Sequence, residues 1–225
     1  MDIAVLGTGI VGRTLAGGLV RAGHAVAVGT RDPETTLART EPDGMGNPPF
    51  AAWHAEHPDV SLATYADATA RADLVVLAGN GSAAIDVLTA AGAEHLAGKV
   101  VLDVTNPLDF SGGFPPTLFV KDTDSLGEQV QRAFPDARVV KSLNTMTASL
   151  MVDPGQLGET TTVFVSGEDA DAKAIVTALL ADLGHRDVVD LGGIETARGV
   201  EMYLPLWLRT MGALGTGVFN IKVVR

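Results

Sequence analysis

The sequence predicts an α/β fold in which a doubly wound, mostly parallel sheet carries a helical extension at its C-terminal end. Short runs rich in β-branched residues alternate with longer segments that have helical spacing along most of the chain. The apolar runs are continuous rather than alternating, which is typical of strands buried on both faces of a parallel sheet. Alternation of strands and helices in this way indicates a sheet with helices on both faces.

The predicted strands begin with IAVLG, at the start of the chain, and recur at intervals that leave room for a helix between most of them. The run at 60–64 is the weakest of the set, because its apolar content is low. The strands are expected at 3–7, 25–29, 60–64, 73–79, 99–105, 137–143, 161–167 and 186–192.

The predicted helices lie between these strands. The segment 11–23 has its apolar side chains at helical spacing, and 82–92 does likewise, with Ser82 as a candidate N-cap. The segment 168–184 begins with acidic residues and ends at a glycine, as the helix dipole and the geometry of a C-cap prefer. A shorter amphipathic helix is expected at 124–134.

The segment 40–59 interrupts the alternation, because its first half is rich in proline, glycine and asparagine. We expect it to form a surface excursion with one helical turn near 50–57. Elsewhere the chain shows no long linker, no repeat and no shift of composition. The sequence therefore predicts a single domain that spans residues 1–225.

Composition excludes several classes of function. The 225-residue chain has a net charge of −11, which argues against binding to DNA or to an anionic membrane. It has no cysteine, which excludes disulfides, cysteine-ligated zinc, iron–sulfur clusters and thiol catalysis. The start of the chain has no signal-peptide pattern, and the uncharged run after Arg209 is too short to span a bilayer, so we expect a cytoplasmic protein.

The stretch GTGIVG follows the first strand directly and precedes the first helix. It comprises Gly7, Thr8, Gly9, Ile10, Val11 and Gly12. Its first glycine permits a tight turn, its second lets the backbone approach a pyrophosphate, and its third lets helix and strand pack closely. The N–H groups at the start of the helix then face the phosphates. This context predicts the dinucleotide-binding turn of a Rossmann-type fold, rather than a glycine-rich turn without a ligand.

The end of the second strand predicts which dinucleotide binds. Sites for NAD carry an acidic side chain about 20 residues after the glycine motif, where it holds the ribose hydroxyl. This chain has Thr30 and Arg31 there, a hydroxyl and a guanidinium that suit a phosphate. Asp32 comes one place later and is expected to cap the next turn. The sequence therefore predicts NADP rather than NAD, unless Arg31 is only a solvated loop residue.

Three asparagines follow three successive central strands of the predicted sheet. Asn80, Asn106 and Asn144 each lie at or just past the end of a strand, and strand ends line the ligand crevice in such folds. An asparagine there can present its amide to the nicotinamide or to a second ring, although asparagine is also common in ordinary turns. We expect these residues, with Pro107, to shape the redox end of the site.

The redox end lacks an obvious acid–base residue. The five histidines lie in connections or in the 40–59 excursion without the spacing of a metal site, and we predict neither a metal nor a catalytic side chain. Lys141 is the one candidate for acid–base chemistry, and a structural or phosphate-facing role is the alternative. Hydride transfer to a flavin or deazaflavin ring depends mainly on positioning, so this pattern favours a second redox ring.

Three stretches together carry a family resemblance: VLGTGIVG at 5–12, VGTRDPE at 28–34 and VVKSLNTMTASLM at 139–151. With them the chain resembles the NADPH:F420 oxidoreductase family, whose second substrate is the deazaflavin F420, and it is similar to the NADPH domain of STEAP-type metalloreductases. The resemblance implies that Thr30 and Arg31 hold the 2′-phosphate. It also implies that Asn144, Thr145 and Met146 lie beside the nicotinamide, where the deazaflavin stacks.

The sequence thus predicts hydride transfer between NADP(H) and F420 or a flavin, with a small-molecule coenzyme as partner. Two alternatives remain: a dehydrogenase or imine reductase that acts on a small metabolite, and an NADPH-binding sensor without activity.

Near the C-terminus, Met202, Trp207 and Met211 are expected in the core or in a dimer interface, and we expect a homodimer.

Overall fold

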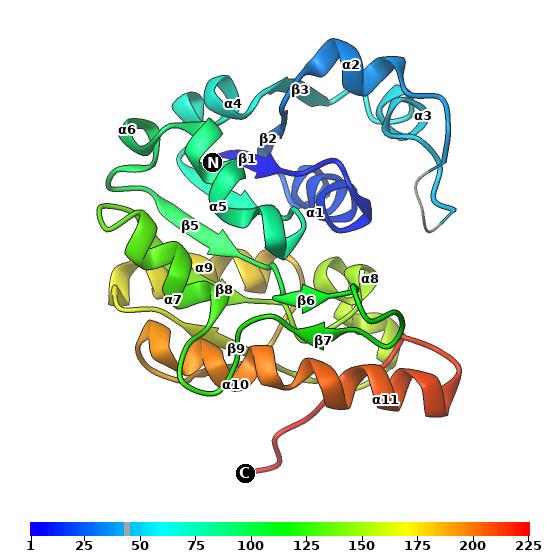
Figure 1. Ribbon diagram of the computed structural model, residues 1–225, viewed down its shortest axis with the longest axis vertical. Coiled ribbons are helices and arrows are strands. Elements are labelled where there is room, and N and C mark those ends of the chain that lie inside the picture. The colour runs from blue at the N-terminus through cyan, green and yellow to red at the C-terminus, as the bar shows by residue number, and fades with distance from the viewer. Residues whose placement is uncertain (43–45) are drawn as a thin grey trace.

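The centre of the molecule is an eight-stranded sheet with the strand order β10-β9-β8-β5-β4-β1-β2-β3. The computed structural model describes residues 1–42 and 46–225 (Figure 1). All eight predicted strands are present, and their ends differ from the predicted ones by at most two residues. They are β1 (Asp2–Leu6), β2 (Ala25–Thr30), β3 (Val60–Thr64), β4 (Leu74–Leu77), β5 (Val100–Asp103), β8 (Arg138–Ser142), β9 (Thr162–Ser166) and β10 (Asp187–Asp190).

Strand direction changes once across this sheet. The pairs from β3 through β2, β1, β4 and β5 to β8 are all parallel, whereas β9 runs antiparallel to β8 and β10 runs parallel to β9. β1 pairs with β2 on one side and with β4 on the other, so the chain winds outward in both directions from the β1–β4 boundary. This confirms the doubly wound, mostly parallel sheet.

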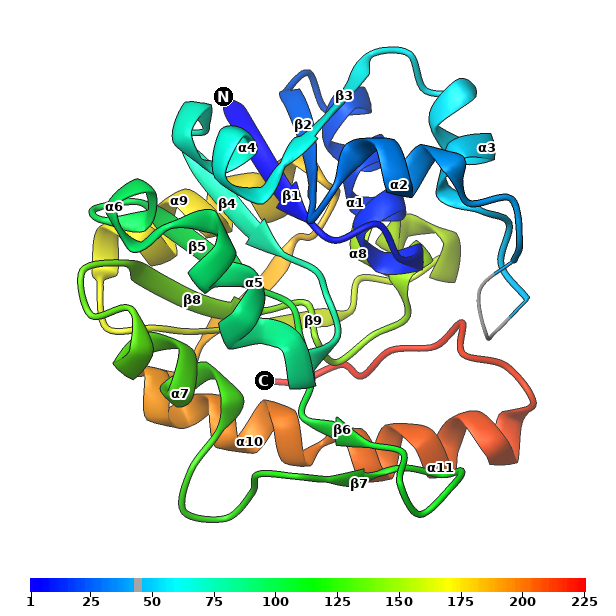
Figure 2. The same cartoon turned by 45° about the horizontal axis from the view of Figure 1, so that its top comes forward.

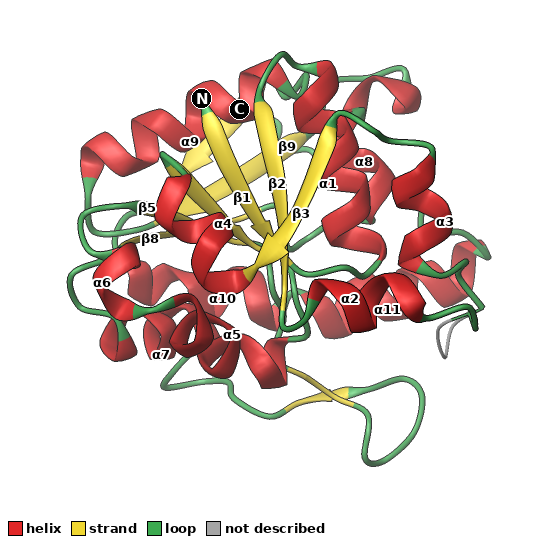
Figure 3. Cartoon of the chain, turned by 90° about the horizontal axis from the view of Figure 1, so that it is seen from above, coloured by secondary structure: helices red, strands yellow, loops and turns green. Residues whose placement is uncertain are grey.

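Two apolar cores lie on opposite faces of the sheet, because successive side chains of a strand point to opposite faces. In β1, Ile3 and Val5 join the core that α1 (Ile10–Arg21) and α9 (Ala170–Asp182) cover. Ala4 and Leu6 of the same strand join the core on the other face. Figure 3 shows the strands in a fan between two groups of helices.

The second face is covered by a row of shorter helices. Asn80, rather than Ser82, caps the turn that opens this row: its Oδ1 accepts from the Ser82 N–H at 3.1 Å. Ser125 caps the helix predicted at 124–134, and on the first face Asp169 caps α9. The elements on this face are α4 (Tyr65–Arg71), the 3₁₀ turn η1 (Gly81–Ala83), α5 (Ala84–Ala91), α6 (Ala93–Leu96), α7 (Leu126–Ala133), the 3₁₀ turn η3 (Ile194–Thr196) and α10 (Ala197–Met202).

The predicted excursion at 40–59 contains α3 (Phe50–Ala55), which agrees with the expected helical turn near 50–57. A further short helix, α2 (Pro33–Ala38), precedes it. Phe50 is buried and joins the core beside α1. Residues 43–45 of the predicted excursion lie outside the described residues.

A two-stranded hairpin follows β5 and has no counterpart in the prediction. It pairs β6 (Leu108–Asp109) with β7 (Thr117–Leu118) in antiparallel fashion. Figures 1 and 2 both show it beside α10 and α11 (Leu204–Leu214). The hairpin and α11 also line a shared cavity of about 390 Å³.

The C-terminal segment folds back across the sheet edge. α11 ends at Gly215, which has a φ of 67°, and the tail returns so that the Thr162 N–H donates to the Ile221 carbonyl at 3.0 Å. Trp207 stacks on Phe219 at a centroid distance of 5.4 Å. Met202 is 37% exposed and Trp207 and Met211 are half-buried, so none of these residues belongs to the core. Among the described residues, no helix is long and apolar enough to cross a membrane.

Candidate functional site

One edge of the sheet collects the loops in which the site residues were predicted. Because β8, β5, β4, β1 and β2 are parallel neighbours, their C-terminal ends lie side by side at this edge. The loops therefore follow one another in space in the order Asn144, Asn106, Asn80, the Gly7–Gly12 turn and Thr30–Arg31. This order suits an extended dinucleotide that lies across the point where the sheet winds in two directions.

The Gly7–Gly12 turn leaves open space over its second glycine. A Cβ on Gly7, whose φ is 139°, would lie 2.7 Å from the Ala78 carbonyl oxygen, and a Cβ on Gly12 would lie 2.0 Å from the Gly7 carbonyl oxygen. A Cβ on Gly9, by contrast, would meet nothing within 4 Å. Gly7 and Gly12 thus permit the close packing of strand, loop and helix, whereas Gly9 faces the space that a pyrophosphate would occupy.

The start of α1 completes this cradle. Gly9 is the N-cap and supplies no side-chain acceptor, so the first N–H groups of the helix are left for a ligand. Thr8 and Val11 are half-buried and Ile10 is exposed. Thr8 and Gly9 line a cavity of about 520 Å³, whose wall also includes Arg13 and Arg39. The residues present fit a pyrophosphate group.

At the end of β2 the predicted phosphate ligands lie in different environments. The Thr30 hydroxyl is buried and lies 2.8 Å from the Thr36 hydroxyl, whereas Arg31 is exposed. Burial raises the pKa of Tyr65, and the positive charge of Arg31 partly opposes that rise. Asp32 caps α2, as expected, by accepting from the Thr35 N–H at 2.9 Å. Arg31 is therefore the group that is open to a phosphate.

At the redox end, two of the three predicted asparagines bind each other. The Asn144 Nδ2 donates to the Asn106 Oδ1 at 3.0 Å, and the Asn106 Nδ2 donates back to the Asn144 carbonyl at 2.9 Å. The Asn144 Nδ2 also donates to the Val200 carbonyl at 3.1 Å. Both amide hydrogens of Asn144 therefore have acceptors within the protein.

The remaining residues predicted here are mostly buried. Asn80 is exposed but accepts from the Ser82 N–H and hydroxyl, so it is held within its own turn. Pro107, Thr145 and Met146 are buried. Leu143, directly before Asn144, has a φ of 60°, a conformation that costs free energy in a branched residue and that only the surrounding structure can maintain. The β8 loop is thus held in one shape.

A buried ion cluster beneath this loop was not predicted. The Lys141 Nζ lies 2.9 Å from an oxygen of Asp103 and 2.9 Å from an oxygen of Glu201. Burial alone would lower the pKa of Lys141, but the charges of Asp103 and Glu201 outweigh it and raise the pKa above its ordinary value. Lys141 is therefore a buried cation in a structural network, rather than an accessible acid or base.

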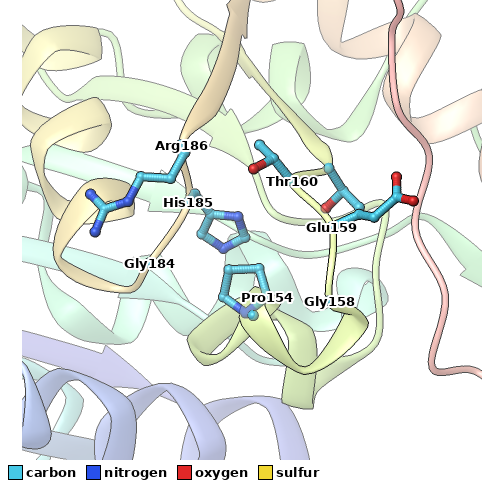
Figure 4. A pocket seen from close by; sticks show the side chains of 9 residues that line it. Pro154, Gly158, Glu159, Thr160, Gly184, His185 and Arg186 are labelled. Carbon is cyan, nitrogen blue, oxygen red and sulfur yellow. The ribbon is translucent and has the colours of Figure 1, made fainter.

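A separate pocket is lined by none of the residues that were predicted to bind the nucleotide. It has a volume of about 280 Å³ and is formed by the loops that precede β9 and β10. Figure 4 shows His185 there between Arg186 and Thr160, next to Pro154. Burial lowers the pKa of His185, partly offset by its hydrogen bond to the Met151 carbonyl. Nowhere in 1–42 and 46–225 do three or more possible metal ligands come together.

Comparison with known proteins assigns the family. The family model for F420-dependent NADP oxidoreductases matches residues 2–107. An F420-dependent NADP reductase of Methanothermobacter marburgensis is 30% identical over 213 residues, which cover 92% of this chain and 90% of that relative. The chain belongs to the F420-dependent NADP reductase family. This reductase family accounts for the Rossmann-type fold and makes the protein an NADP(H)-dependent oxidoreductase.

Two further relatives support the family and show its breadth. The crystal structure of a protein of Arthrobacter sp. FB24, provisionally named an F420-dependent NADP reductase, has a TM-score of 0.96 and 62% identity over the whole of both chains. Metalloreductase STEAP3 of Rattus norvegicus is 27% identical over 95% of this chain but over 39% of its own length. The predicted resemblance to both groups is confirmed.

Proposed function

We propose that this reductase passes a hydride between NADP(H) and the deazaflavin F420. The observation that best supports this proposal is the open space above Gly9. It lies at the C-terminal edge of the parallel strands, where the loops at Arg31 and at the Asn106–Asn144 pair also lie. The nicotinamide supplies the hydride when the dinucleotide is bound. The residues Gly7, Thr8, Gly9, Ile10, Val11 and Gly12 hold the pyrophosphate, and Thr30 and Arg31 select the 2′-phosphate. Asn80, Asn106, Pro107, Asn144, Thr145 and Met146 shape the redox end.

The character of the redox end favours a ring as hydride acceptor. Lys141, the one residue considered for acid–base chemistry, is 0% exposed and paired with two carboxylates. A dehydrogenase that reduces a carbonyl needs a proton donor at the reacting oxygen. F420 has no such requirement at the carbon that receives the hydride, and a proton from water completes the reduced ring. The chain's contribution is then to position two rings and to exclude water between them.

The direct test mixes the purified protein with NADPH and F420 without oxygen and follows the visible absorbance of the deazaflavin. NADH and FMN are measured in parallel. We expect rapid bleaching with NADPH and F420. Binding of NADPH without bleaching would reject F420 as the acceptor. Turnover of an imine or carbonyl without F420 would then support the metabolite reductase, and no turnover with any acceptor would support the sensor.

Removal of the Arg31 guanidinium should change the preference between cofactors. In Arg31→Ala we expect NADPH affinity to fall about 10- to 100-fold, because hydrogen bonds to a charged group contribute about 1.5–3 kcal/mol. NADH, which lacks the phosphate, should bind with nearly unchanged affinity. Titration of both nucleotides by protein fluorescence measures this, and Arg21→Ala, an exposed arginine at the far end of α1, is the control. Equal losses for both nucleotides would contradict the assignment.

The protein is further proposed to be a single domain that forms a homodimer in the cytoplasm. Large apolar side chains are exposed on α11 and on the hairpin: Leu206 is 61%, Leu214 58% and Phe114 70% exposed. Exposed apolar patches of this kind mark protein interfaces. Light scattering at micromolar concentration should give twice the chain mass, and Leu206→Glu should shift it toward the monomer. A monomeric mass for the unaltered protein would refute the dimer.

A further inference from the structure

The buried ion cluster joins three segments that are far apart in the sequence. Lys141 lies on β8, Asp103 at the end of β5 and Glu201 on α10, and the three charged groups are at most 2% exposed. Asp103 and Lys141 are direct neighbours in the register of the two strands. The cluster therefore ties the centre of the sheet to a helix on one of its faces.

Each carboxylate of the cluster also binds backbone groups. The Asp103 Oδ1 accepts from the Thr105 N–H at 2.8 Å and from the Thr105 hydroxyl at 2.6 Å. The Glu201 oxygens accept from the N–H groups of Leu126 and Gly127, at 2.8 and 3.0 Å, at the start of α7. Both carboxylates are thus held in place on more than one side.

The same three segments meet again at the asparagine pair. Asn106 follows Thr105, Asn144 lies three residues after Lys141, and Val200, whose carbonyl accepts from Asn144, directly precedes Glu201. Each ionic group is therefore within three residues of a member of the hydrogen-bonded group at Asn106 and Asn144. Asp103 and Lys141 are thus linked through short stretches of backbone to Asn106 and Asn144, and Glu201 is linked to the Val200 carbonyl that Asn144 binds.

Fold stability alone gives little reason to bury these charges. A buried ion cluster must repay the loss of hydration of every group, and replacement by apolar side chains of similar volume is often neutral or stabilising. A cluster of this kind is retained in some proteins because it fixes one arrangement among several. The left-handed Leu143, between Lys141 and Asn144, likewise needs its surroundings to hold it.

We propose that Asp103, Lys141 and Glu201 are positioning residues for hydride transfer, which hold the Asn106–Asn144 pair and α10 in one arrangement. The inference rests on the proposed function, because it assumes that this pair borders the nicotinamide and its acceptor. The cluster does not touch the substrates. It fixes the loops against which the two rings align, and a displacement of 1 Å at such a site can reduce a rate about 100-fold.

The test replaces Glu201 with glutamine, which keeps the shape of the side chain and removes its charge. An amide in this place can accept fewer of the three hydrogen bonds that the carboxylate accepts. We expect faster amide hydrogen exchange in the peptides that contain 104–107 and 142–147. We also expect a kcat for F420 reduction that is about 10- to 100-fold lower, with a KM for NADPH that changes less than about twofold.

The matched control is Arg198→Gln, which breaks an ion pair between α10 and α7, the two helices that Glu201 also joins. Arg198 on α10 binds both oxygens of Glu128 on α7, but neither residue hydrogen-bonds the cluster or the asparagine pair. The control should lower the melting temperature without changing exchange at 104–107 and 142–147 or the kcat. If Glu201→Gln changes only the melting temperature, as the control does, the cluster is structural and the proposal is wrong.

A milder variant covers the case in which Glu201→Gln does not fold. Thr105→Val removes one hydrogen bond from Asp103 without a change of charge, and it should give the same pattern with smaller changes. Unchanged exchange and kcat in a folded Thr105→Val protein would then overturn the proposal. Hydrogen exchange needs no substrate, so failure of the unaltered protein to reduce F420 would refute the proposed function while the exchange result still tests the cluster.

Discussion

Substitution of Gly9 by alanine is expected to remove most of the affinity for NADPH while the protein remains folded. The backbone of Gly9 is extended, with φ at −73° and ψ at −178°, a conformation that alanine adopts without strain. The added methyl group would meet no protein atom within 4 Å, and it would occupy the space of the pyrophosphate. We expect at least about a 100-fold loss of affinity, which corresponds to about 3 kcal/mol, or one strong charge-assisted hydrogen bond.

The control for this prediction is Gly12→Ala in the same turn. Its Cβ would lie 2.0 Å from the Gly7 carbonyl oxygen, so strand and helix would have to separate and the melting temperature should fall. Calorimetric titration with NADPH and thermal unfolding of the unliganded proteins separate the two effects. A Gly9→Ala protein that binds NADPH normally would show that the open space does not receive the pyrophosphate.

Substitution of Lys141 by methionine is expected to cause one of the largest losses of stability available in this chain. The change leaves the carboxylates of Asp103 and Glu201 buried without their cation, and breaking a buried ion pair in this way costs about 3–5 kcal/mol. Urea unfolding of the variant and of the unaltered protein measures the loss.

Lys173→Met provides the comparison. Lys173 pairs with Asp190 at 2.9 Å, but that carboxylate is 54% exposed, so the pair should contribute less than about 1 kcal/mol. Similar losses in the two variants would contradict a special role for the buried cluster.

The pKa of Lys141 is raised in the unaltered protein. This lysine therefore stabilises the fold at all pH values below its ordinary pKa. The contribution is lost only as the pH rises through the raised value.

The sheet was predictable from the sequence because its strands are buried on both faces. Short continuous apolar runs such as 73–79 and 99–105 are typical of strands that are buried on both faces. The glycine turn marked the end of the first strand. The hairpin β6–β7 was not predictable, since each strand has two residues within a segment rich in glycine and proline. It lies beside α11, which is about 90 residues further along the chain, so no local pattern indicates its position.

The site was predictable in part, and the limit is set by contacts between distant residues. The side chain of Asn80 caps its own turn, whereas the side chains of Asn106 and Asn144 are held by a hydrogen bond between residues 38 positions apart. The sequence alone cannot distinguish these two roles of an asparagine. Asp103 and Lys141 gave a usable signal, because each is a charged residue that directly follows an apolar run within a predicted strand. Glu201 gave none, since nothing local shows that α10 covers that part of the sheet.

The boundary of the family match at residue 107 divides the predicted site residues between two halves of the chain. The matched half contains the Gly7–Gly12 turn, Arg31 and Asn106, while Asn144, α10, α11 and most of the hairpin belong to the other half. The similarity to full-length relatives is not confined to the first half, because the reductase of Methanothermobacter marburgensis aligns with 92% of this chain and STEAP3 with 95%. The hydrogen bonds between Asn106 and Asn144 join the two halves at the predicted redox end.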